Sequence, residues 1–414
     1  MFSKDLALKI LTIGVFLCEI PAIFAWSNGK FTTLPLFVWW CMYAIMLLGL
    51  HILSPKNYKV KIINLWWWSV IANVIYGLVF QVENYWDYKA LIGNFWIFSL
   101  PISVYAFSAP STVKAVLKFW FKYSWVLIIL LLPLVNSSWY GRLLVPYCFL
   151  SLFYSILPFK QKIWVIGVFI FLLSFSLEAR TDVMRFSFAL FLGIIISIHR
   201  FLININAILK YMLHVLLLLP IILFILGITN VFNVFNIQEE FNIQGEYVVV
   251  TESGGEDDLL YDTRTFIYQE CLSSAVYHNY VLFGRSIARG YDSAFFSFND
   301  DNLVAAGRGI ERLSSEVAIM NIFTYFGVVG CILYFIIFYV ASYKAVYCSN
   351  NHYVPIIGVY VAFKWFLSWI EEYTMYELNL VILWLMVAIC FSPWFRKMTN
   401  ADFEKWIKSI FVKS

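Results

Sequence analysis

The chain has 414 residues, of which 62% are hydrophobic, 20% aromatic and 13% charged, with a formal net charge of +4. A soluble domain needs about twice that charged fraction to solvate its surface. The composition therefore excludes a soluble globular protein, a disordered chain and a small disulfide scaffold. It indicates a protein that crosses a membrane many times.

Apolar runs recur along the chain, and each is long enough, or nearly so, to cross about 30 Å of hydrocarbon as a helix. We therefore expect an all-α membrane protein with about twelve spans. The predicted spans cover residues 6–25, 34–53, 62–80, 91–107, 125–135, 143–157, 163–177, 185–198, 211–232, 317–340, 354–370 and 378–392. The fifth and sixth are short and are also consistent with one re-entrant pair.

These spans divide the chain into four parts: transmembrane helices in 1–232, a large external loop in 233–316, further transmembrane helices in 317–392, and a tail in 393–414. Twelve spans put both termini on one side of the membrane. Lysine and arginine are concentrated in the loops of that side, so the positive-inside rule predicts that both termini are cytoplasmic.

The tail is predicted to form an amphipathic helix on the anionic cytoplasmic leaflet. Its apolar face would consist of Phe403, Trp406, Ile407 and Ile410, with lysines opposite. We expect this segment to act as an anchor.

The external loop is where function is expected, because long connections in compact proteins usually carry it. Its sequence predicts a strand over 246–251, a turn at 253–255 and an amphipathic helix over 259–277. A loop over 284–301 and a second helix over 309–316, leading into the tenth span, are expected to follow.

The external loop contains five arginines and no lysine. They are Arg264, Arg285, Arg289, Arg308 and Arg312. Arginine presents a planar fork that binds phosphate oxygens with two hydrogen bonds, whereas lysine offers a point charge. A continuous helix would put Arg308, Arg312 and Glu316 on one face, with its positive N-terminal end toward the same anion. The alternative is a simple i, i+4 charge ladder.

Two further places carry charges that function could use. Residues 178–182 form a short external corner with Arg180, followed by Arg185, and its alternative interpretation is a solvated corner with ion pairs. Lys364 lies within the eleventh span, where a lysine indicates a functional site, with Glu371 or Glu372 as the expected partner. The competing interpretation is a lysine whose amine reaches the outer surface.

The motifs of soluble enzymes are absent from the sequence. It contains no Walker loop, dinucleotide glycine fingerprint, HExxH or paired-cysteine zinc spacing. We therefore expect no nucleotide-driven transport, no cofactor, no metal and no nucleic-acid partner, and we expect any chemistry to face outward and to use an activated substrate.

Three places resemble the O-antigen polymerase and ligase superfamily. Leu177-Glu178-Ala179-Arg180-Thr181 is similar to that family's Ser-Arg-Thr corner, with Ala in place of Ser. His278-Asn279-Tyr280-Val281-Leu282-Phe283-Gly284-Arg285-Ser286 is similar to its His-Pro-Leu-x-Gly-x-Gly turn, with Asn for Pro and Ser for the last Gly. The stretch from Glu316 to Gly327-Val328-Val329-Gly330 is similar to a helix ending in Gly-x-x-Gly, with Glu316 where ligases have histidine. That departure indicates the Wzy-type polymerase branch.

The resemblance implies a glycosyltransferase of GT-C type in the bacterial inner membrane. It would polymerise undecaprenyl-pyrophosphate-linked repeat units into O-antigen or capsular polysaccharide on the periplasmic side, beside a flippase and a chain-length regulator. The catalytic candidates are Glu316, as base, with Arg180 and Arg285. The substrate-binding candidates are Arg264, His278, Arg289, Arg308, Arg312 and Lys364, and His278 is the next candidate for the base.

Three alternatives stay open at this point. An O-antigen ligase would share the site, although Glu316 in place of histidine argues against it. A flippase or transporter for lipid-linked sugars would also have twelve spans and would use Lys364, but it has little need for the external loop. A scaffolding protein is the remaining class.

Overall fold

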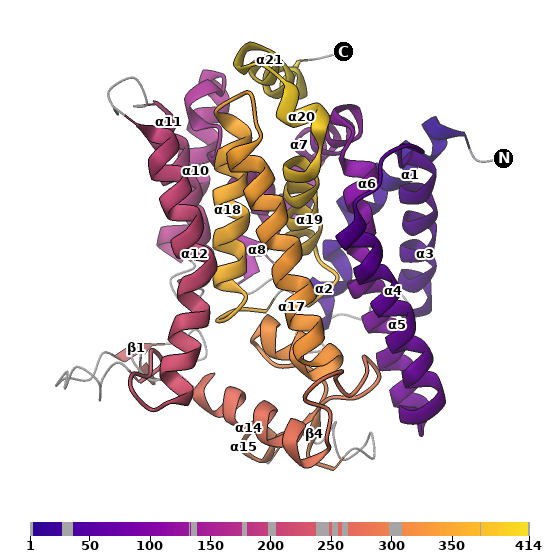
Figure 1. Ribbon diagram of the computed structural model, residues 1–414. Coiled ribbons are helices and arrows are strands. Elements are labelled where there is room, and N and C mark those ends of the chain that lie inside the picture. The colour runs from indigo at the N-terminus through magenta and orange to yellow at the C-terminus, as the bar shows by residue number, and fades with distance from the viewer. Residues whose placement is uncertain are drawn as a thin grey trace.

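The computed structural model describes residues 3–26, 36–131, 133, 139–175, 180–197, 204–236, 248–250, 256–258, 264–297, 309–372 and 374–412. The described chain is predominantly helical, and its longer helices run side by side (Figure 1). Within these residues, five helical segments are long and apolar enough to cross a membrane, which is the character of a multi-pass membrane protein. A helix suits that environment because it satisfies its own backbone hydrogen bonds.

Those five segments correspond to predicted spans. They are α3 (Leu36–Leu53), α4 (Lys61–Tyr76) continued by the π-turn η1 (Gly77–Gln81), α5 (Tyr85–Ser99) continued by η2 (Leu100–Ile102) and α6 (Ser103–Phe107), α12 (Ile205–Ile228), and α17 (Ala318–Tyr347). Shorter helices occupy most of the other predicted spans: α1 (Lys4–Leu17) with α2 (Glu19–Trp26), α10 (Phe159–Phe175), α11 (Arg180–Ser197), α18 (Tyr353–Leu367) and α19 (Leu378–Phe391).

The fifth and sixth predicted spans differ from the structure. α7 (Pro110–Leu131) is one continuous helix, so Lys114, Lys118 and Lys122 lie on its first half and not in a loop. The sixth span is broken into α8 (Tyr140–Leu143), α9 (Val145–Ser151) and the turn η5 (Tyr154–Ile156). Lysine is a good helix former, so these residues do not end a helix.

The centre of the molecule is formed by α17, α18 and α19. α18 packs against α17, α12 and α19, and nearly every residue of α18 and α19 is buried. Helices that are apolar all round are expected in such a position.

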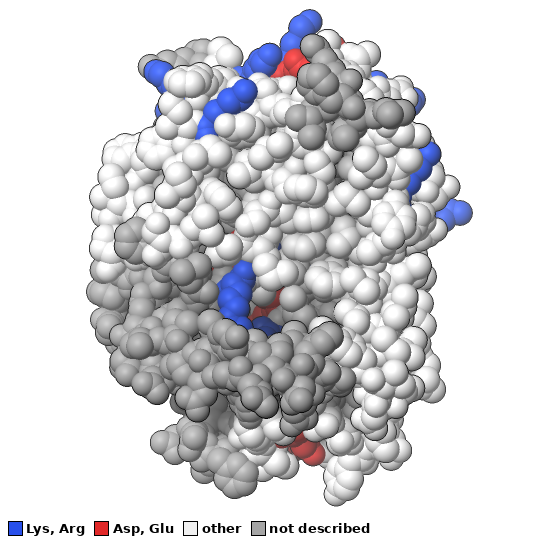
Figure 2. Space-filling view, turned by 90° about the vertical axis from the view of Figure 1, so that its left-hand side faces the viewer, with Lys and Arg blue, Asp and Glu red and all other residues white. Residues whose placement is uncertain are grey.

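Both termini lie at one end of the helices, as expected, and the described parts of the external loop lie at the other (Figure 1). On the face shown in Figure 2, Lys and Arg side chains gather at the end that holds the termini. Below them the described surface is largely uncharged, apart from one hollow with basic and acidic side chains and an acidic patch near the opposite end. An uncharged band between polar ends is typical of a protein surrounded by lipid.

The tail is helical, but its apolar face has a different partner from the one expected. α21 (Asn400–Phe411) follows the short α20 (Pro393–Lys397), and Phe403, Trp406 and Ile410 are buried. Trp406 Nε1 donates to the carbonyl oxygen of Pro110 at 3.1 Å, at the start of α7. The apolar face therefore packs on the protein itself, and the prediction of a lipid contact for it is wrong.

The external loop contains two small antiparallel pairs of strands. β1 (Val248–Val250) pairs with β2 (Glu256–Asp258), which confirms the predicted strand, whereas the predicted turn at 253–255 lies outside the described residues. α14 (Arg264–Tyr277) confirms most of the first predicted helix. Further along, β3 (Tyr291–Asp292) precedes the one-turn α15 (Ala294–Ser297) and pairs with β4 (Glu311–Arg312).

Candidate active site

α17 is broken at Gly327, which adopts φ 66° and ψ −166°. A break frees backbone groups that need new partners. The turn after α14 supplies them: Val328 N donates to Val281 O at 2.9 Å, and Arg285 N donates to Thr324 O at 2.7 Å. The turn and the broken helix therefore form one unit.

Two glycines allow this close contact. Gly284 has φ 79° and Gly327 has φ 66°, conformations that side chains disfavour. A Cβ atom on Gly284 would collide with the backbone of Tyr325, and one on Gly327 would collide with the backbone of Leu282. The Gly284-Arg285-Ser286 and Gly327–Gly330 motifs, which are distant in the sequence, pack directly against each other.

Asn73 of α4 fastens this unit to the rest of the membrane domain. Its Nδ2 donates to Tyr325 O at 2.7 Å, and its Oδ1 accepts from Ile287 N at 2.8 Å. Sequence reasoning missed Asn73, because a lone asparagine in an apolar run carries no signal about a partner more than two hundred residues away.

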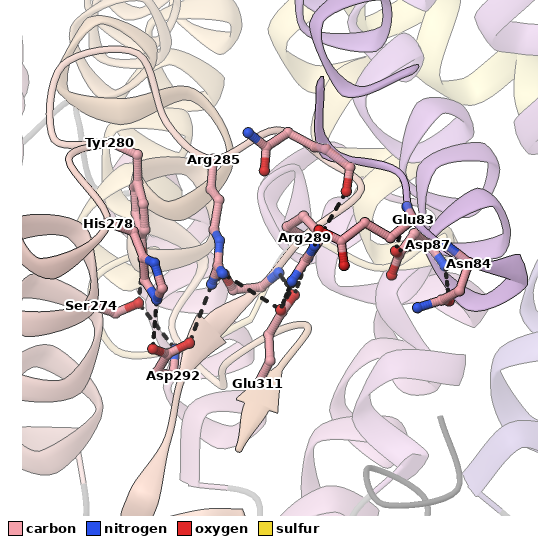
Figure 3. A network of polar contacts seen from close by, with 12 residues as sticks. Glu83, Asn84, Asp87, Ser274, His278, Tyr280, Arg285, Arg289, Asp292 and Glu311 are labelled. Atoms are coloured by element: carbon pink, nitrogen blue, oxygen red, sulfur yellow. Dashed lines mark hydrogen bonds and ion pairs between the residues drawn. The ribbon is translucent and has the colours of Figure 1, made fainter. Parts of the chain in front are cut away.

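A network of charges follows the turn and is called the loop network below. It consists of His278, Arg285, Arg289, Asp292 and Glu311 (Figure 3). His278 Nε2 lies 2.7 Å from Asp292 Oδ2, and Arg285 Nη1 lies 3.3 Å from Asp292 Oδ1. Arg289 contacts Glu311 through Nε at 3.0 Å and Nη2 at 2.7 Å, a two-pronged ion pair. Its Nη1 also reaches Glu83, at 3.4 Å.

Glu311 is the most enclosed member of the loop network, with 3% of its side chain exposed. Burial alone would raise the pKa of its carboxyl, but hydrogen bonds from Arg289 and Gly290 N and the charge of Arg285 outweigh burial and hold that pKa below its ordinary value. The hydrogen bond to Glu311 likewise raises the pKa of Arg289. The carboxylate is thus held ionised and keeps two guanidinium groups in place.

An open cavity of about 880 Å³ lies beside the loop network. His278, Arg285, Arg289 and Glu83 line it, together with Asn73 and residues of α4 and α17. A cavity of this size can hold part of a large ligand. Cationic and apolar surfaces both face the space.

The prediction of a helix over 309–316 is wrong, because Glu311 and Arg312 form β4 and pair with β3. Successive side chains of a strand point to opposite faces. Glu311 accordingly joins the loop network, and Arg312 points the other way. Arg312 Nη1 donates to Tyr291 Oη at 3.3 Å, and Arg312 Nη2 lies 3.8 Å from Glu316 Oε1. Glu316, with 59% of its side chain exposed, forms the expected i, i+4 ion pair without the helix.

Two other predicted site residues, Arg264 and Arg180, do not line this cavity. Arg264, at the start of α14, donates through Nε to Ile370 O at 2.6 Å and so ties that helix to the connection after α18. Arg180 begins α11 and is exposed. Arg308 is outside the described residues, as is the corner segment 178–179.

Lys364 belongs to a second set of charges, enclosed between helices and called the membrane cluster below. Its members are Arg142, Asp182, Arg185, Lys364, Glu371 and Glu377. Lys364 Nζ lies 3.1 Å from Asn379 Oδ1, and the residue is 1% exposed. Its amine therefore does not reach the surface, and Glu371, one expected partner, forms an ion pair with Arg185 at 2.8 Å.

Sequence reasoning brought together only part of the loop network. His278, Arg285 and Arg289 were candidates, but their carboxylate partners Asp292 and Glu311 were not. The signal for them was weak, because the external loop holds many acidic residues and their pairing depends on the β3–β4 register.

Comparisons with known proteins found no match: no family model, no curated protein and no solved structure matches the chain.

Proposed function

We propose that the protein is a membrane glycosyltransferase of the Wzy type, in the bacterial inner membrane. It polymerises undecaprenyl-pyrophosphate-linked repeat units into O-antigen or capsular polysaccharide on the periplasmic side. The observation that carries the proposal is the convergence of His278, Arg285 and Arg289 on one cavity at the end of the molecule opposite the termini.

The arginines are suited to the leaving group. Transfer forms a bond between the acceptor hydroxyl oxygen and the anomeric carbon of the donor, and it breaks the bond from that carbon to the pyrophosphate. Negative charge grows on the departing phosphate, and positioned cations stabilise that charge. Arg285 and Arg289 face the cavity, while Asp292 and Glu311 lie outside its lining and hold them in place.

His278 is suited to remove the proton of the acceptor hydroxyl. Its Nε2 contacts Asp292, which fixes the orientation of the ring and leaves Nδ1 as the nitrogen that takes up the proton. Glu316 is less suited to this role, since it is largely exposed, pairs with Arg312 and does not line the cavity. We therefore assign the base to His278.

Arg285 provides the decisive test. In a strain that lacks the chromosomal copy, Arg285→Ala should abolish polymer and leave single repeat units, with the protein at normal abundance in the membrane. Arg285→Lys should restore little, because lysine cannot make the two-pronged phosphate contact.

Arg312→Ala is the matched control. Arg312 belongs to the same external loop, but its side chain lies on the face of β4 opposite to that of Glu311. It should leave the length distribution of the polymer close to wild type. Normal polymer in both Arg285 variants would remove the loop network from catalysis, and equal loss in the Arg312 variant would indicate general damage to the loop.

A further inference from the structure

A second group of basic side chains lies at the end of the molecule that holds the termini. α12 begins at this end, α17 ends there at Tyr347, and α20 follows α19 there (Figure 1). Lys210, Lys344 and Arg396 come from these three helices and are called the basic site below. The glycosyl transfer proposed above, at the opposite end of the helices, makes no use of them.

Lys344 and Arg396 meet at Phe391, the last residue of α19. Lys344 Nζ lies 5.4 Å from the centre of the Phe391 ring, and Arg396 Nη2 donates to Phe391 O at 3.5 Å. Arg396 Nη1 donates to Cys348 O at 3.2 Å, so the guanidinium ties the end of α17 to the end of α19. Both acceptors are neutral carbonyls, which leave the positive charge of Arg396 uncancelled. Each Nη atom also keeps a second N–H group for a ligand.

Lys210 reaches the same surface from α12. Its Nζ lies 4.8 Å from the centre of the Tyr347 ring, three residues after Lys344 on α17. Tyr347 Oη lies 3.1 Å from Nε2 of His214, which also belongs to α12. The basic site therefore spans the ends of three helices that contacts with one another's residues hold in place.

The acidic residues of the neighbouring α21 have other partners. Glu404 lies 3.7 Å from Lys408 and accepts from Tyr353 Oη at 2.8 Å, and Asp402 accepts from Thr399 Oγ1 at 2.7 Å. Within the part of the chain that the structure describes, no ion pair joins a member of the basic site to a carboxylate. A surface that carries three such cations attracts anions.

An aromatic surface adjoins the basic site. Tyr339, Tyr343 and Tyr347 follow one another at every fourth residue of α17, with stacked rings, and are 37–40% exposed. Trp394 of α20 is 44% exposed, and its ring lies 5.3 Å from that of Tyr58. Exposed aromatic side chains of this kind are typical of the boundary between hydrocarbon and headgroups. An anion at the basic site is therefore level with the phosphates of the lipid.

The length of α17 agrees with this level. Residues 328–347 form the uninterrupted part of the helix after Gly327, and at about 1.5 Å per residue they cover about 30 Å, the thickness of the hydrocarbon layer. The loop network docks at the break and so lies at one boundary of that layer. Lys344, in the last turn of α17, then lies at the other boundary.

We propose that the basic site binds the headgroup phosphate of an anionic phospholipid, in the leaflet on the side of the termini. The phosphate lies between Lys344 and Arg396, Lys210 adds a third positive charge, and an acyl chain lies along the tyrosines of α17. A zwitterionic lipid carries an ammonium group that these cations repel, so the site selects phosphatidylglycerol over phosphatidylcholine. This inference does not depend on the proposed function.

The test uses the full chain in phosphatidylcholine nanodiscs, with a phosphatidylglycerol probe that is photoreactive near its headgroup. Light should attach the probe to peptides that contain residues 339–350 and 391–397. A basic residue at a membrane surface strengthens the binding of anionic lipid about fivefold. Lys344→Gln should therefore raise the probe fraction needed for half-maximal labelling about fivefold, and Lys344→Gln/Arg396→Gln should raise it about 30-fold.

The single variant decides the test if the double variant fails to fold, because Arg396 also binds two carbonyls. Lys344→Arg keeps the charge and should label within about twofold of wild type. Unchanged labelling in Lys344→Gln, or equal losses in Lys344→Gln and Lys344→Arg, would overturn a site that recognises charge.

Lys4→Gln/Lys9→Gln is the matched control, because it removes two positive charges from exposed residues of α1 at the same end of the molecule. It should leave the labelling at the wild-type level. A loss as large as that of the Lys344/Arg396 variant would overturn a specific site and leave only the general attraction of a basic surface.

Two further probes identify the ligand. Phosphatidylcholine with the same photoreactive group should label these peptides at least about tenfold less, and equal labelling would overturn the selection of an anionic lipid. Glycerol 3-phosphate in solution should not displace the phosphatidylglycerol probe. Its displacement by glycerol 3-phosphate would assign the site to a soluble phosphate and overturn the lipid.

Discussion

The loop network and the membrane cluster are built from the same residue types but have different surroundings. Both pair arginines with carboxylates at 2.7–2.8 Å. The loop network borders a cavity of about 880 Å³, whereas the cavity beside Arg185 and Lys364 holds only about 10 Å³, roughly the room for one water molecule. A dense group of charges thus points to a binding site only where there is space for a ligand.

His278 and Asp292 of the loop network are also more exposed than the paired charges around Arg185 in the membrane cluster. In the loop network, 26% of the Asp292 side chain and 29% of that of His278 are exposed. Arg185 and Asp182 are each 2% exposed, and Glu371 is 6% exposed. Through Arg185, which pairs with Asp182 and Glu371, the membrane cluster joins α11 to the connection between α18 and α19.

The largest expected effect comes from breaking the membrane cluster at Arg185. Arg185→Ala leaves Asp182 and Glu371 buried without their shared cation, which should lower the free energy of unfolding by about 3–5 kcal/mol. Immunoblots of membranes should show little protein. Adding Asp182→Asn and Glu371→Gln should recover part of the abundance, since the two buried carboxylates that lost the guanidinium are then neutral. Normal abundance of the single variant would contradict a structural role.

A smaller effect is expected from Glu311→Gln in the loop network. The change keeps the shape but removes the charge that binds Arg289 and accepts from Gly290 N at 2.7 Å. A hydrogen bond to a charged acceptor contributes about 1 kcal/mol more than one to a neutral acceptor, so the Gly290 amide should exchange hydrogen about fivefold faster. Peptides of α18, which is remote from the loop network in sequence, serve as the internal reference. Unchanged exchange around Gly290 would show that Glu311 does not hold the loop.

Lowering the pH should remove the same contribution. Because the pKa of Glu311 is lowered in the folded protein, its ionised form stabilises the loop above the unfolded value of about 4.3, and this stabilisation disappears as the pH falls through the folded-state value. The difference in melting temperature between wild type and Glu311→Gln should be constant near neutral pH and vanish in strong acid. A difference that grows on acidification would have the wrong sign for this pair.

The smallest effect is expected at Glu316. Its ion pair with Arg312 is long and largely exposed, and such pairs contribute about 0–1 kcal/mol. Glu316→Gln should therefore change neither the abundance of the protein nor the length of the polymer. Loss of polymer at normal abundance would instead return the base to Glu316 and count against His278.

The sequence predicted the helices better than the contacts between them. Apolar runs mark most of the described membrane helices, because a helix in lipid satisfies its backbone locally. The candidate site could be predicted in part, since His278, Arg285 and Arg289 lie within a short stretch of chain. The helix expected over 309–316 was wrong, because the spacing of Arg312 and Glu316 suits a helix but β3 provides a competing backbone partner.

The sequence by itself determined that this chain belongs in a membrane, which segments are apolar enough to cross it, and that arginine is concentrated in the external loop. The tertiary structure decided which charges meet. Asn73 holds the loop against α4, Gly284 and Gly327 let the turn dock on the broken helix, and the β3–β4 register sends Glu311 and Arg312 to opposite sides. Hydropathy is a sum over neighbouring residues and can be read locally, whereas ion pairs and cavities depend on where distant segments come together.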